Sequence, residues 1–214
     1  MSKIAIKGNE SGTATFTIEA PATNTDRIFE LPDEAGKILT DVGVPTSAMP
    51  AGSVIQVVQT VKTDVFSASV TQGVSTAVTG LSVNITPSSS NSKILVMLAV
   101  SAATGNTTTS ATEPGFTYIR LKRGATNLGL GTGGDYQVTA GIAGITDISR
   151  SGAESRVPNT GSYTFLDSPS TTSQITYQVE IGQTRGPSNL IYVNRANANE
   201  GRTSSTITVM EIAG

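Results

Sequence analysis

Short runs in which apolar and polar residues alternate are the feature that most constrains how this chain can fold. A period of two places the apolar side chains on one face of an extended strand, and Leu81, Val83 and Ile85 share such a face within residues 80–87. Between the runs lie stretches rich in Gly, Ser and Thr, and no segment has the apolar spacing and end signals of an α-helix. The pattern predicts an all-β protein. The predicted strands cover residues 53–61, 80–87, 94–100, 116–123, 174–181, 190–194 and 205–212.

The number and spacing of these strands indicate how they are arranged. About eight strands over about 160 residues fit a β-sandwich or a closed barrel, and a jelly-roll-like β-sandwich is the arrangement we expect. Residues 94–100 are apolar at every position, so they predict a central strand that is covered on both faces. Loops are predicted at residues 101–115, 124–135, 150–162 and 182–188.

The first fifty residues differ from the rest of the chain. Two alternating runs, residues 13–18 and 27–31, are followed by a linker rich in Pro, Gly and small residues at 44–52. Strands this short cannot bury a face alone, so we expect neighbouring chains to cover them. We therefore predict an extended β segment for attachment and oligomerisation at residues 1–50 and the sandwich at 51–214; alternatively, the first segment adds strands to the sandwich. The side chains expected in the oligomer contact are Phe16, Ile18, Ile28, Phe29 and Leu31.

Composition excludes several classes of function. The 214 residues include no His, Cys or Trp, which removes Ser-His-Asp and Cys-His catalysis, thiolate metal sites and disulfides. Charged residues make up only 14% of the chain, and 14 Lys and Arg against 16 Asp and Glu leave no field that would attract nucleic acid. No run of 18 apolar residues predicts a membrane span, and the first residues lack the apolar core of a signal peptide. We expect synthesis in the cytoplasm.

The candidate chemical motifs are weak. Residues 129–134 match the spacing G-x-G-x-x-G, but no helical pattern follows them, so we interpret them as a loop rather than a dinucleotide site. Asp135, Asp147, Glu154 and Asp167 lack the spacing of a calcium loop, and nothing pairs them as glycosidase carboxylates. We therefore predict no catalytic, cofactor-binding or metal-binding residues.

Five further charges interrupt the strand patterns. Arg120, Lys122 and Arg123 end one predicted strand, and we interpret them as edge-strand charges that discourage mispairing. Glu180 and Glu211 each lie within an otherwise alternating strand. Glu211 shares a face with apolar residues, so it marks a subunit seam, the rim of the domain, or simply the end of the alternation.

Two regions resemble proteins of bacteriophage particles. Residues 6–17, 20–24 and 31–39 resemble a short leader found on bacteriophage tail-fibre and structural proteins. The remainder resembles a module common in cyanophage-like genomes. The resemblance implies a virion protein with a jelly-roll-like domain that forms a homotrimer. The segments that carry the second resemblance are residues 80–87, 92–96, 165–169, 175–177, 194–195 and 205–212.

The leading hypothesis is a non-enzymatic, trimeric tail-fibre or receptor-binding module. Residues 1–50 would bind other virion proteins, and polar loops would meet host-surface glycans. The alternatives are a capsid decoration or head-fibre protein and, disfavoured by the missing His, a polysaccharide-degrading enzyme. Aromatic candidates for recognition are Tyr118, Tyr136, Tyr163 and Tyr192, whereas Tyr177 alternates with apolar residues and is expected in the core.

Overall fold

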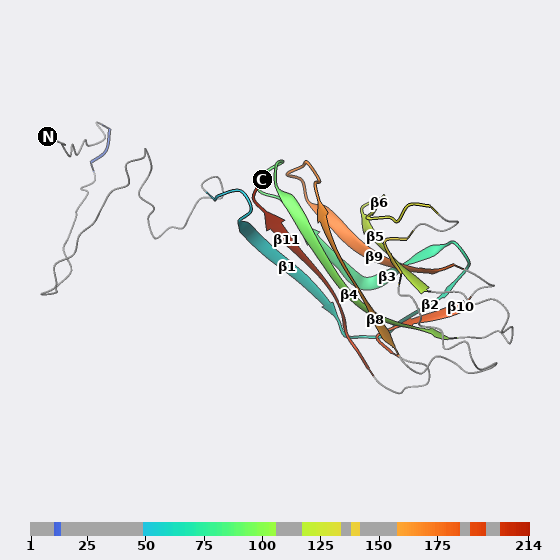
Figure 1. The fold of residues 1–214 in the computed structure, drawn as a ribbon. Coiled ribbons are helices and arrows are strands. Elements are labelled where there is room, and N and C mark those ends of the chain that lie inside the picture. The colour runs from blue at the N-terminus through green and yellow to red at the C-terminus, as the bar shows by residue number, and fades with distance from the viewer. Residues whose placement is uncertain are drawn as a thin grey trace, which may run out of the picture. The chain divides into compact units, whose positions relative to one another are not determined.

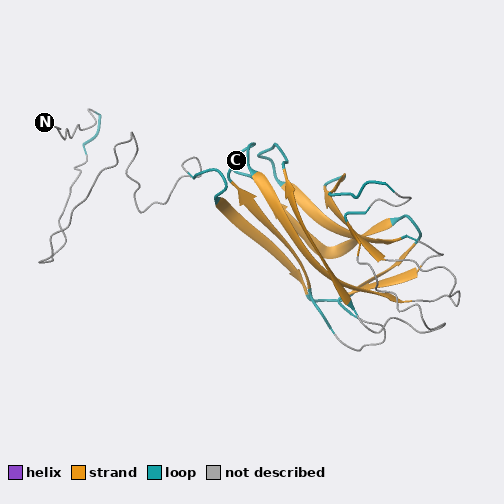
Figure 2. Ribbon diagram, in the orientation of Figure 1, coloured by secondary structure: helices purple, strands orange, loops and turns teal. Residues whose placement is uncertain are grey.

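The computed structural model describes residues 11–13, 49–105, 117–133, 138–141, 158–184, 189–195 and 202–214. Within those residues it contains eleven strands and no helix (Figure 2). The chain divides into two compact units, residues 1–41 and 42–214. The first unit lies almost wholly outside the described residues, so the segment and the boundary predicted near residue 50 remain predictions.

One antiparallel sheet, which we call sheet A, is built around β4. One edge of β4 pairs with β8, and its other edge pairs first with β11 and then with β10. Because β1 pairs with β11 and β2 with β10, sheet A has four strand positions, two of which are occupied by two strands each. Its strands are β1 (Val54–Lys62), β2 (Phe66–Val70), β4 (Lys93–Gly105), β8 (Asn159–Asp167), β10 (Asn189–Val193) and β11 (Ser205–Ile212).

The second antiparallel sheet, sheet B, has the order β3, β9, β5 and β6. Both β6 and the very short β7 pair with the free edge of β5, so sheet B also has four strand positions. Its strands are β3 (Ser75–Ile85), β5 (Thr117–Arg123), β6 (Thr126–Leu128), β7 (Ala140–Gly141) and β9 (Ile175–Gln183).

When strands that share a position are counted as one, the eight positions can be numbered in chain order. Across sheet A the positions then run first, eighth, third and sixth, and across sheet B they run second, seventh, fourth and fifth. Eight positions interleaved in this way between two sheets form a jelly roll, which confirms the predicted fold. Figure 1 shows the two sheets facing each other. Their facing sides enclose one apolar core, in which Leu81, Val83, Ile85 and Tyr177 are buried as the alternation predicted. Each such side chain contributes roughly 1.5–3 kcal/mol on burial.

The two ends of the sandwich differ in how the chain enters and leaves them. At one end, the turn before β1 is bonded to the chain terminus: Gly52 N–H donates to the Ala213 carbonyl and Ala213 N–H to the Ser53 carbonyl, each at 2.8 Å. We call this the closed end; it also carries the connections 86–92, 124–125 and 168–174. The opposite end, the loop end, carries the connections 71–74, 106–116, 142–158 and 184–188.

All seven predicted strands are present, but four others were missed. β2, β6, β7 and β8 lie in segments without a clear apolar alternation, and β6 and the start of β8 fall in predicted loops. In β8 the inward positions include Gly161, and Leu166 points outward, which obscures the period of two. The prediction for residues 94–100 was half wrong. β4 is central, yet its outer side chains Leu95, Met97 and Ala99 are only partly buried among the described residues.

Candidate functional site

The structure removes most tyrosines from the list of recognition residues. Tyr118 and Tyr192 are buried, and Tyr163 points into the sandwich, where its hydroxyl donates to the Gly129 carbonyl at 3.3 Å. Tyr136 lies outside the described residues. Of the four candidates, the three described rings are therefore buried or directed into the sandwich. The predicted oligomer residues Phe16, Ile18, Ile28, Phe29 and Leu31 also lie outside the described residues.

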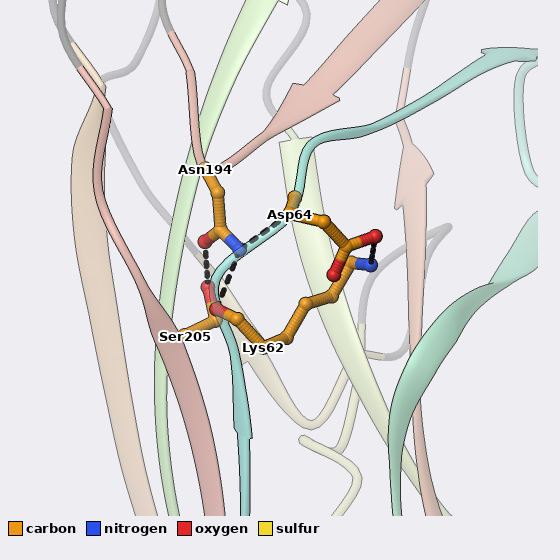
Figure 3. A network of polar contacts seen from close by, with 4 residues as sticks. All are labelled: Lys62, Asp64, Asn194 and Ser205. Atoms are coloured by element: carbon orange, nitrogen blue, oxygen red, sulfur yellow. Dashed lines mark hydrogen bonds and ion pairs between the residues drawn. The ribbon is translucent and has the colours of Figure 1, made fainter.

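A neutral polar network closes the break in sheet A, where β1 gives way to β2 and β10 to β11. Asn194 is fully buried with a positive φ of 63°. Its amide nitrogen donates to the Lys62 carbonyl at 2.8 Å and to the Asp64 carbonyl at 3.0 Å, while Ser205 donates to its amide oxygen at 2.6 Å (Figure 3). The hydroxyl of Ser205 also accepts the Ser101 N–H at 3.0 Å. The side chains of Asn194 and Ser205 together thus join both interrupted strand positions to β4.

The Lys62 side chain lies beside this network. Its ammonium nitrogen is buried and binds the Asp64 carboxylate at 2.6 Å, while the Asp64 side chain is 76% exposed (Figure 3). The hydrogen bond from Lys62 holds the pKa of the Asp64 carboxyl below its ordinary value. Gly80 leaves room for the ammonium group, since a Cβ atom there would lie 3.4 Å from the lysine nitrogen. The ion pair gives the buried ammonium group of Lys62 a partner of opposite charge, and the side chain of that partner, Asp64, remains exposed to water.

A second polar cluster joins the two sheets near the closed end. Arg123 of β5 donates to both carboxylate oxygens of Asp167 in β8, at 2.7 and 2.8 Å. The Tyr177 hydroxyl of β9 donates to the same carboxylate at 2.6 Å. Burial and the neighbouring carboxylate raise the pKa of Tyr177 well above its ordinary value. The carboxylate accepts three hydrogen bonds from two residues, so Asp167 acts as a clamp between the sheets and not as a solvated loop residue.

Glu211 is a fully buried carboxylate at the closed end of sheet A. Gln56 donates its amide to one oxygen, and Ser88 donates both its N–H and its hydroxyl to the other, at 2.7 and 2.6 Å. Burial alone would raise the pKa of Glu211, but the hydrogen bonds from Gln56 and Ser88 outweigh it and hold the pKa below its ordinary value. Of the alternatives left open by the sequence, the structure places Glu211 at the rim, where it binds the turn between β3 and β4.

The outer face of sheet B carries charge. Lys122 binds Glu180 at 3.3 Å, and Ser75 connects Glu180 to Arg120 through its hydroxyl. The Arg120 guanidinium also lies 5.3 Å from the Tyr118 ring centroid. The edge-strand interpretation of the basic residues was therefore wrong, because β5 lies between β9 and β6, and its cations bind Ser75 of β3, Glu180 of β9 and Asp167 of β8. Sequence alternation could have placed Glu180 and Lys122 on outer faces, but it could not have shown that they form an ion pair.

The outer face of sheet A is instead apolar. Val57, Met210, Leu95 and Leu166 lie in register across the four strand positions and form one continuous row. Val57 is 55% exposed and Leu166 48% exposed. We refer to these four residues as the apolar row. Sequence reasoning missed it because Leu166 lay in no predicted strand.

The remaining candidate motifs show no assembled site. Residues 129–133 form a loop after β6 rather than the start of a helix. Asp135, Asp147 and Glu154 lie outside the described residues. Within the part of the chain that the structure describes, no three acidic side chains gather closely enough to hold a metal ion, and no helix there is long and apolar enough to span a membrane.

Comparison with known proteins gives only distant structural likeness. No family model matches the chain, and no curated protein matches it. Solved structures with some similarity include the VP2 subviral particle of infectious bursal disease virus, with 13% identity and a TM-score of 0.35 over 74% of this chain and 38% of that one. The Gx strain of the same virus gives 12% identity and a TM-score of 0.36 over 77% of this chain and 37% of that one. The chain thus spans little more than a third of those proteins, and its function is inferred from its own residues and topology.

Proposed function

We propose that the chain is a non-enzymatic structural protein of a virus particle, a trimeric tail-fibre or receptor-binding module that adheres to the host surface. The observation that supports this proposal is the difference between the two ends of the jelly roll in the chain segments that they carry. The chain enters and leaves at the closed end, through the turn bonded to Ala213. Connections 106–116, 142–158 and 184–188 all leave from the loop end. Such a domain can be attached at one end while it presents loops at the other.

The composition of the loop-end connections suits a glycan partner. Residues 106–116 contain four Thr and one Ser, and residues 142–158 contain further Ser, Thr and charged side chains. Hydroxyl and carboxylate groups can exchange hydrogen bonds with sugar hydroxyls. The resemblance of residues 1–50 to phage leaders supports their attachment to other virion proteins. The buried carboxylates Asp167 and Glu211 have structural partners, which leaves neither available as a hydrolytic acid.

Immunogold electron microscopy of intact particles tests the proposal. Antibody raised against residues 51–214 should place gold at the tail, and antibody depleted with the purified protein should place none. Gold distributed over the head would contradict the adhesin role and would identify the chain as a capsid decoration protein. Purified particles that bind no gold and contain no trace of the chain by mass spectrometry would refute the proposal for both locations.

A further inference from the structure

The outer face of sheet A is the largest feature that the proposed function leaves without a role. Four large apolar side chains on this face are 48–55% exposed: Val54, Val57, Val61 and Leu166. Val54 pairs with Ile212 beside the apolar row, and the next rows contain Met97 and uncharged polar residues. The apolar row therefore runs unbroken from β1 to β8, and the next row across the sheet is Gln59, Thr208, Met97 and Thr164.

Charge is nearly absent from this face. Of the described residues that β1, β4, β8 and β11 direct outward, only Lys93, at the closed end, carries a charge. The outer face of sheet B, by contrast, carries Arg120, Lys122 and Glu180 joined by polar contacts. The two outer faces belong to the same sandwich, so the general shortage of charge in the chain does not explain the difference.

The chemistry of the face selects a second copy of the chain as its occupant. The four side chains of the apolar row offer no hydrogen bonds to a glycan, and the outward residues of β1, β4, β8 and β11 include only one charge, Lys93, with which to select a charged partner. The same face on other copies has matching chemistry, and a closed ring of identical subunits turns the same face of each subunit toward its axis. Methionine at the centre of the row can adapt its shape to such a contact.

The size of the face also suits an oligomer contact. Four strand positions spaced by about 4.8 Å, over about eight residues of about 3.3 Å each, cover roughly 500 Å² of sheet. Three copies that turn these faces toward one axis would cover roughly 1,500 Å² in all, or roughly 500 Å² on each chain. The turn at Gly52 and Ser53 joins β1 at the edge of the same face, so packing there would bring the attachment points of neighbouring chains together.

We propose that the outer face of sheet A, centred on the apolar row, is the interface between copies of this chain. The inference rests on the oligomer of the proposed function and names the surface that forms it. The faces of sheet A converge on the axis of the assembly, and the charged faces of sheet B point to solvent. The partly exposed side chains of β4, Leu95, Met97 and Ala99, then lie in the contact between copies.

Light scattering after size exclusion of the full chain tests this interface. The wild-type protein should elute at three times the chain mass of 21.9 kDa, and Val57→Lys with Leu166→Lys should reduce it to the mass of one chain. The matched control is Asn84→Lys, an exposed position on edge strand β3 of sheet B, which should leave the oligomer intact. A wild-type monomer at tens of micromolar, or a double variant that keeps the wild-type mass, would overturn the interface.

Thiol labelling provides a readout if the lysine variant does not fold, because the chain contains no cysteine. Val57→Cys and Asn84→Cys each introduce one thiol on an edge strand. In the native protein the thiol introduced by Val57→Cys should react at least tenfold more slowly than that of Asn84→Cys, with equal rates in urea. Equal rates in the native protein would refute the proposal.

The interface and the virion role can fail independently. Gold on particles together with an oligomer that the apolar-row variants do not change would refute the interface alone. Dissociation by those variants, with no gold on particles, would keep the interface and refute the virion role.

Discussion

Sheets A and B place their polar groups in opposite ways. The break in sheet A is closed inside the sandwich by the neutral side chains of Asn194 and Ser205, and its outer face is apolar. Sheet B carries Arg120, Lys122 and Glu180 on its outer face, and its inner face is apolar apart from Arg123 and Tyr177, which bind Asp167 of sheet A. A buried amide can be satisfied by a few hydrogen bonds, whereas a buried charge loses much more hydration, so the carboxylates that do lie inside, Asp167 and Glu211, each accept three hydrogen bonds.

This comparison predicts an order of effects on stability. Polar groups that lie inside and have no access to water should be costly to remove, since their partners stay buried without a replacement. Ion pairs on the outer face of sheet B should matter little, because water replaces the lost partner. Unfolding free energies of substitutions in the two sheets measure the difference directly.

Asn194→Ala should give the largest effect. It removes two donated bonds and one accepted bond in the core, and it places an alanine at a positive φ. We expect a loss of about 3 kcal/mol in the free energy of unfolding, measured by urea denaturation. Asn194→Gly, which tolerates the positive φ, should recover about 1 kcal/mol of that loss. A cost below that of the surface variants would contradict the proposed role of the network.

Glu211→Gln should rank second, because it tests a charged group inside sheet A. The amide cannot accept from both Gln56 and Ser88 as the carboxylate does, so we expect a loss of about 2 kcal/mol at pH 7. The folded-state pKa of Glu211 is lowered, so its contribution is present above the unfolded pKa of about 4.3 and is lost as the pH falls through the folded value. The difference between variant and wild type should therefore shrink below about pH 4. A difference that is independent of pH would show that the charge does not contribute.

Tyr177→Phe tests the clamp that joins the two sheets. It removes one donor to Asp167 and leaves the two bonds from Arg123, so we expect a loss of about 1 kcal/mol at neutral pH. The folded-state pKa of Tyr177 is raised, which means that its contribution is complete below the unfolded pKa of about 10 and declines as the pH rises above it. The variant should thus approach the wild type in alkaline urea titrations. Tyr163→Phe, which removes only a 3.3 Å bond, is the matched control and should cost less.

Sequence alone predicted the fold because the fold class depends on the period of the apolar alternation and on the number of strands. The alternation in residues 80–87 and 205–212 determines which side chains face the core, and seven such runs imply a sandwich. The missed strand β8 shows the limit: Gly161 and Leu166 break its alternation, so only pairing with β4 defines it. A hydrophobic pattern reports only which side chains are buried within one chain. β8 is in addition an edge strand, because only one of its edges pairs with another strand of sheet A.

The candidate surfaces could not be predicted because they depend on register. The apolar row needs four residues from four strands to lie opposite one another, and no local pattern contains that information. The same holds for Arg123, Asp167 and Tyr177, which are separated in sequence and meet only when the sheets pack. Asn194 carried a weak signal, since Asn is the residue other than Gly that best tolerates a positive φ.

Glu180→Gln should give the smallest effect and provides the sharpest contrast with Asn194→Ala. Lys122 and Glu180 lie 3.3 Å apart, with side chains 24% and 12% exposed, and the variant keeps an oxygen that can accept from Ser75. We expect a loss of about 0.5 kcal/mol, reduced further at high salt because ions screen the pair. Urea denaturation at low and high salt measures both effects. A loss as large as that of Asn194→Ala, or one that salt does not change, would mean that the outer face of sheet B is covered in the assembly, and the assignment of the oligomer contact to sheet A would then need to be reversed.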